Sequence, residues 1–67
     1  MTRKECINLL TVKMSDATGH SRTVCREFAE RMIEPFNIRA EADKYYNDYA
    51  DAIENDFNFW LTKFKEK

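Results

Sequence analysis

The clearest pattern of apolar and polar positions lies in residues 22–34, where apolar side chains recur every three or four positions. These positions are Val24, Cys25, Phe28, Ala29, Met32 and Ile33. The spacing predicts a helix with one face directed at a core. Pro35 disfavours the helical conformation of the residue before it, so the helix is expected to end at Glu34. Ser21 and Thr23 are the candidates for its N-cap.

Residues 3–14 carry a weaker signal. Cys6, Ile7, Leu10 and Met14 share one helical face, but the same stretch also alternates as a strand would. Periodicity does not separate the two in so short a segment. A helix is favoured because no other segment resembles a partner strand. Residues 15–21 are expected to form a loop in which Gly19 takes a positive φ.

The third predicted helix runs from Ile38 to about Lys65, with Asn37 as its N-cap. Its core stripe follows steps of three and four residues and consists of Ala42, Tyr46, Tyr49, Ile53, Phe57, Trp60 and Phe64. At 1.5 Å per residue this helix is about 40 Å long. The sequence therefore predicts an all-α fold, a single domain over residues 1–67 with two short helices and one long C-terminal helix.

A second apolar seam lies beside that stripe, at Tyr45, Ala52 and Phe59, which are spaced by seven. Two short helices can cover one stripe, but the stripe and the seam together form an apolar arc wider than two short helices are expected to bury. Three interpretations stay open: the rings flank the core, they pack in a homodimer, or they meet a different protein. Aromatic residues at a surface favour an interface because they are enriched in binding hot spots.

Charge is unevenly distributed although the net charge is only −1. Between residues 40 and 60 there are six acidic residues and one basic residue, Lys44. Such a face either serves solubility or imitates the phosphates of a nucleic acid. Small phage-encoded inhibitors, including anti-CRISPR and anti-restriction proteins, are similar in size and charge pattern. The residues predicted to bind a partner are Tyr45, Asp48, Asp51, Ala52, Asp56 and Phe59.

The alternative prediction is a regulator that binds nucleic acid through the basic residues Arg3, Lys4, Arg22 and Arg26. Two short helices joined by a turn could form a helix-turn-helix. The stretch MTRKECINLL, followed by Thr18–Ser21, resembles the helical start of HU-type nucleoid proteins. This resemblance covers about the first twenty residues, and no β-ribbon arm follows. Glutamates also interrupt the basic face of residues 22–34, which disfavours this prediction.

No residues with the spacing of a catalytic or cofactor motif occur, so the chain is predicted not to be an enzyme and to hold no cofactor. Cys6 and Cys25 are expected to be reduced core residues. A bridge between them or a metal site with His20 is the alternative, but the spacing matches no zinc pattern. Without a signal peptide or an apolar membrane span, a cytoplasmic location is expected. The predicted function is a small regulatory or inhibitory protein that binds a protein partner.

Overall fold

The computed structural model describes residues 1–36 and 39–66, with the backbone alone at residues 39 and 40. This part of the chain contains helices and no strand. The helices are α1 (Arg3–Thr18), α2 (Arg22–Met32), α3 (Arg39–Asn55) and α4 (Phe57–Lys65). The all-α prediction is confirmed, and residues 3–14 belong to a helix, as favoured. The predicted N-cap Asn37 lies outside the described residues.

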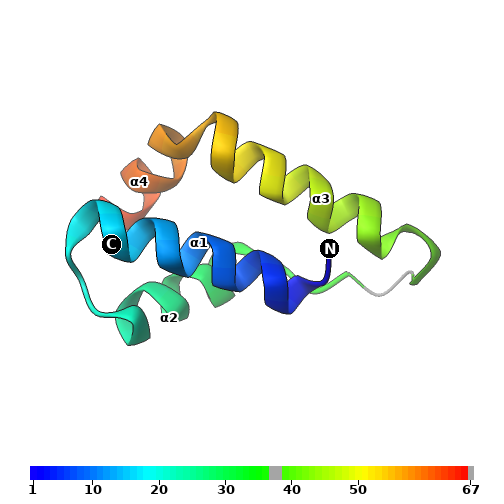
Figure 1. Ribbon diagram of the computed structural model, residues 1–67, viewed down its shortest axis with the longest axis horizontal. Coiled ribbons are helices and arrows are strands. Elements are labelled where there is room, and N and C mark those ends of the chain that lie inside the picture. Colours follow the sequence, from blue (N-terminus) through cyan, green and yellow to red (C-terminus); the bar gives the residue numbers. More distant parts are fainter. Residues whose placement is uncertain (37–38, 67) are drawn as a thin grey trace.

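Helices α1 and α2 form an antiparallel hairpin (Figure 1). Thr2 caps α1: its side chain accepts a hydrogen bond from the backbone of Glu5, whose side chain accepts one from the backbone of Thr2 in return. The Thr-x-x-Glu pattern at residues 2–5 is the sequence signature of this capping box. Helix α1 continues to Thr18, so the prediction of a loop from residue 15 was wrong. Gly19 ends the helix at φ 79°, the conformation expected for it.

Ser21 is the N-cap of α2 and accepts a hydrogen bond from the backbone N–H of Val24. The helix ends at Met32, two residues before the predicted end at Glu34. At that end the guanidinium of Arg3 donates hydrogen bonds to the backbone oxygens of Ile33 (2.9 Å) and Glu30 (3.1 Å). These bonds satisfy carbonyls that have no partner within the helix, and they tie the start of α1 to the end of α2.

The prediction of one long helix from residue 38 to 65 was wrong. The helix breaks at Asp56, which has φ −137° and ψ 48°, and α4 begins at the next residue. Asn55 and Asp56 are both weak helix formers, so the break falls where propensity is lowest. A straight helix of that length would extend about 18 Å beyond the 16-residue α1. Turning at Asp56 instead brings α4 back toward the hairpin (Figure 1), where Phe64 packs against Phe28 of α2.

The core joins all four helices. Helix α1 lies in the middle, with contacts to α2 on one side and α3 on the other. The ring of Phe64 meets that of Phe28 edge to face, with centroids 5.1 Å apart. Tyr46 is buried, and its hydroxyl accepts a hydrogen bond from the Phe36 N–H and donates one to the Glu34 carbonyl. The predicted core stripe is confirmed: its members are buried or half-buried in this cluster.

Candidate partner-binding groove

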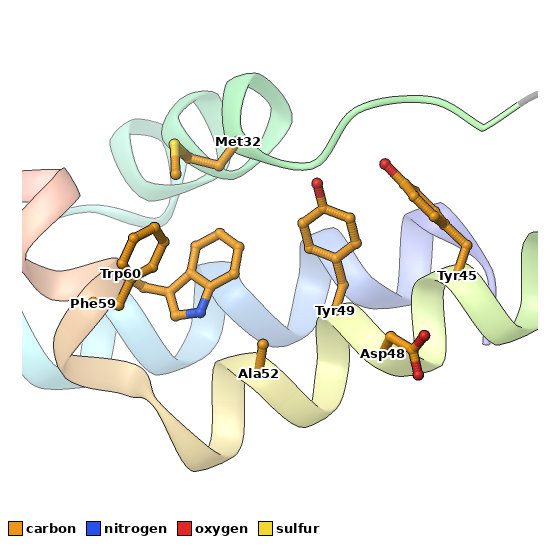
Figure 2. A pocket seen from close by; sticks show the side chains of 7 residues that line it. All are labelled: Met32, Tyr45, Asp48, Tyr49, Ala52, Phe59 and Trp60. Atoms are coloured by element: carbon orange, nitrogen blue, oxygen red, sulfur yellow. The ribbon is translucent and has the colours of Figure 1, made fainter.

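An open groove of about 490 Å³ lies on the described surface, and we call it the aromatic groove. It is lined by Met32 of α2, by Tyr45, Asp48, Tyr49 and Ala52 of α3, and by Phe59 and Trp60 of α4. Figure 2 shows α1 behind these side chains, α2 along one side and α3 along the other. The groove exists because α2 and α3 pack on opposite sides of α1 and leave a gap that aromatic side chains fill only in part.

The aromatic rings of the groove form a continuous series. The centroids of Tyr45 and Tyr49 are 5.1 Å apart, those of Tyr49 and Trp60 5.9 Å, and those of Trp60 and Phe59 5.5 Å. Such edge-to-face and tilted pairs stabilise one another beyond their burial alone. The series therefore forms a stable wall, although Phe59 at its end is 46% exposed. The exposed Phe59 ring and the half-buried rings of the series form one contiguous apolar surface, which is typical of a binding site.

The hydroxyl of Tyr49 keeps its proton to a higher pH than an ordinary tyrosine does. A hydrogen bond with the Tyr45 side chain, burial and the nearby carboxylate of Glu34 raise the pKa of Tyr49 to about 12. Each of these factors disfavours the phenolate. The Tyr49 hydroxyl is therefore neutral at physiological pH, and Asp48 is the one charged residue among those lining the aromatic groove.

Trp60 has a polar group without a partner. Its side chain is 4% exposed, and its indole Nε1 has no hydrogen-bond acceptor among the described residues. In Figure 2 this nitrogen lies on the edge of the ring turned toward α3. A buried N–H without an acceptor destabilises a fold, and such groups are rare in native proteins.

A second concavity of about 270 Å³ adjoins the aromatic groove and shares Tyr45 and Asp48 with it. Its remaining lining residues are Phe36, Glu41 and Lys44. The Phe36 ring stacks on the Tyr45 ring at 4.2 Å, with an angle of 10° between their planes. Glu41 and Asp48 are seven residues apart, so they lie on one face of α3 and place two carboxylates along the rim.

Four of the six residues predicted to bind a partner line the aromatic groove: Tyr45, Asp48, Ala52 and Phe59. Asp51 and Asp56 are exposed and line neither concavity. Asp51 is three positions after Asp48, which turns it about 60° away around the helix. Asp56 lies at the break between α3 and α4.

Sequence reasoning assigned Met32, Tyr49 and Trp60 to the core alone, yet they also line the groove. Their positions in core stripes gave no sign of this second role. One signal was available for Met32: it is in the last turn of α2, where a helix end limits how far its neighbours can cover a side chain. Met side chains also adapt to irregular partners, which suits a groove wall.

The basic residues of the alternative prediction do not form one patch. Arg3 is engaged at the end of α2, and Arg26 donates a hydrogen bond to the Asn8 side chain at 3.0 Å. Arg22 begins α2, whereas Arg3 contacts its far end, about 15 Å away along the helix axis. Lys4 is exposed. A compact phosphate-binding surface would bring these charges together.

Cys6 and Cys25 are free thiols, fully buried, as expected for core residues. Cys6 lies in the first turn of α1 and Cys25 in the first turn of α2, so the two thiols are near opposite ends of the antiparallel hairpin. The Cys6 thiol faces the Tyr46 carbonyl at 3.8 Å, and burial raises the pKa of Cys6. His20 is exposed and meets the Phe64 ring edge to face at 5.2 Å. Within the described residues, no group of three or more His, Cys, Asp or Glu has the arrangement of a metal site.

Comparisons with known protein families, with curated proteins and with solved structures found no match to this chain. Among the described helices, none is both long and apolar enough to cross a membrane.

Proposed function

We propose that this chain is a non-enzymatic regulatory or inhibitory protein that binds a partner protein in the aromatic groove. The observation that carries the proposal is an open concavity whose walls are four aromatic rings from two helices, with Phe59 half exposed at its edge. Tyr and Trp dominate the energetics of protein interfaces because they supply contact area at a small entropic cost. A cytoplasmic location belongs to the same proposal.

The chemistry of the groove supports binding over catalysis. Its polar groups are two phenols, an indole N–H and the exposed carboxylate of Asp48. A nucleophile is activated by an adjacent base that a third group orients, and the residues lining the groove include no such set. No residue lining it is a thiol, an imidazole or an aliphatic alcohol.

The acidic residues favour a partner with a basic surface. Asp48, Asp51 and Asp56 are all exposed and remain available to an approaching protein. This is also what imitation of a nucleic acid, as in phage-type inhibitors, requires, because the partner then offers a phosphate-binding surface. Direct binding of nucleic acid is less favoured, since Arg3 and Arg26 already donate hydrogen bonds within the fold.

Site-specific photocrosslinking tests the proposal. A photoreactive residue replaces Ala52 in the groove or, as a control, the exposed Glu27 on α2. We expect a discrete heavier adduct from position 52 in the cell of origin, no adduct from position 27, and loss of the adduct when Phe59→Ala is added. Adducts of equal yield from both positions contradict the proposal. An adduct of twice the 8.0 kDa chain mass identifies a homodimer instead.

A further inference from the structure

We infer that the aromatic groove receives an arginine side chain from a basic segment of the partner protein, with its guanidinium against Asp48 and its stem along the rings of Tyr45 and Tyr49. This inference rests on the proposed function and names the chemistry of its partner. Charge and the dimensions of the groove support it independently.

The charge of the residues lining the groove favours an occupant with a positive charge. Asp48 is the one charged residue lining the aromatic groove. In the adjoining concavity, Glu41 adds a second carboxylate and Lys44 one ammonium group, so acidic residues outnumber basic ones there. A carboxylate beside aromatic rings favours a cation that can pair with the acid and lie over a ring. The chain shows this affinity in its own contacts, because Lys63 Nζ lies 5.6 Å from the centre of the Phe59 ring. Arginine fits better than lysine because its planar, weakly hydrated guanidinium stacks on rings and binds a carboxylate through two N–H groups.

The indole of Trp60 offers an occupant its ring and not its N–H. The Nε1 atom has essentially no accessible surface, so a group that lies in the groove does not reach it. Arginine has donors only, and the charged acceptor that the groove presents to it is the Asp48 carboxylate.

The dimensions of the groove fit a segment of chain. A volume of about 490 Å³ is within the usual range for ligand sites and exceeds what one side chain occupies. Tyr45 and Ala52 are seven residues apart, which places about 10 Å of α3, two helical turns, along one wall. A short amphipathic helix docks in such a groove through positions spaced by three, four and seven residues.

A second copy of this chain fits less well. In a symmetric dimer the same patch meets itself, so the Asp48 rim of one copy would approach that of the other. The exposed face of α2 does not offer a basic segment either, because Glu27 and Glu30 alternate with its arginines. Like charges across an interface disfavour that pairing.

Two peptides test the inference. One is a blocked amphipathic helical peptide of about fourteen residues with leucines on one face and arginines beside them. The other replaces each arginine with citrulline, which keeps the shape and removes the charge. Trp60 is the single tryptophan of the chain and lines the groove, so its fluorescence reports on binding there.

We expect the arginine peptide to bind at least tenfold more tightly than the citrulline peptide and to change the fluorescence of Trp60. Asp48→Asn should reduce this ratio below threefold. Asp51→Asn, which removes the same charge from an exposed position outside the groove, should leave the ratio near tenfold.

Three results overturn the inference. Equal binding of the two peptides shows that the groove recognises apolar surface alone, and the proposed function then stands without the arginine. An equal effect of Asp48→Asn and Asp51→Asn assigns recognition to the whole acidic face. Binding of neither peptide removes the basic segment as occupant, while the photocrosslinking at position 52 still judges the proposed function separately.

Discussion

Two neighbouring aromatic residues of α4 should differ sharply in their effect on stability. Trp60 is 4% exposed and packs among the groups that join α4 to α3, whereas Phe59 is 46% exposed at the edge of the groove. We predict that Trp60→Ala unfolds the chain or nearly so, and that Phe59→Ala leaves it folded. The pair is a matched test because both substitutions remove an aromatic ring from the same helix.

The magnitudes follow from burial. Replacing a buried Trp by Ala removes its transfer free energy and leaves a cavity, which together cost about 3–5 kcal/mol. A domain of 67 residues has a total stability of about 3–10 kcal/mol, so this loss takes a large share or all of it. About half of the Phe59 ring is in contact with water already, and no enclosed cavity forms, so its loss should cost about 1 kcal/mol.

Thermal unfolding followed by circular dichroism measures both effects. For a domain of this size, 1 kcal/mol corresponds to about 4–8 °C in Tm. We expect Phe59→Ala to lower Tm by about that amount, and Trp60→Ala either to abolish the transition or to lower Tm by at least about 12 °C. Equal shifts for the two variants, or an unchanged Tm for Trp60→Ala, would show that Trp60 does not face the core while Phe59 faces solvent.

Three further predictions concern caps and protonation. Ser21→Ala should lower the free energy of unfolding by about 0.5–2 kcal/mol in urea, because Ser21 caps α2, while Thr23→Ala should change it by less than about 0.5 kcal/mol. Hydrogen bonds from Thr2 lower the pKa of Glu5, so its stabilisation is present above pH 4.5 and is lost as the pH falls through its folded value; Glu5→Gln should flatten urea stability against pH in that acidic range. Tyr49 should ionise near pH 12 in an ultraviolet titration. The stabilisation that comes with its raised pKa is fully present below pH 10 and is lost as the pH rises through 12. Tyr45→Phe should move the transition toward pH 10, and an unmoved transition would show that the hydrogen bond is not the main cause of the raised pKa.

The sequence was sufficient for the helical class and for the starts of α1 and α2, because caps and periodicity are local signals. Ser21 and Gly19 acted as their residue types predict. The length of α1 was underestimated, since Ser15 and Asp16 favour loops in isolation but continue a helix that Thr18 and Gly19 terminate. The break at Asp56 was missed for a different reason. A low helix propensity at one position leads to a bend only when tertiary packing of the segments on both sides stabilises the bent form.

The candidate site was predicted in part because a seam spaced by seven stays on one face of a helix whatever its partners are. Tyr45 and Ala52 belong to α3 and keep that relation. Asp51 was included for its charge, and charge alone does not say which way a side chain faces. Met32 precedes Ala52 by twenty residues. It comes close to the groove face of α3 because of how α2 and α3 pack around α1, which no local pattern encodes.

The break at Asp56 also explains why the groove exists at all. In an unbroken helix, Phe59 and Trp60 would lie on the same straight axis as Tyr45 and Tyr49, and they would extend beyond the hairpin. The turn places the rings of α4 beside Met32 of α2, so the two ends of the groove belong to two helices joined by one residue. An occupant that contacts both ends holds the angle between α3 and α4, and because it binds only the folded chain it must stabilise the fold as its concentration rises. The feature that a long-helix prediction lacked is therefore the one that forms the proposed binding groove.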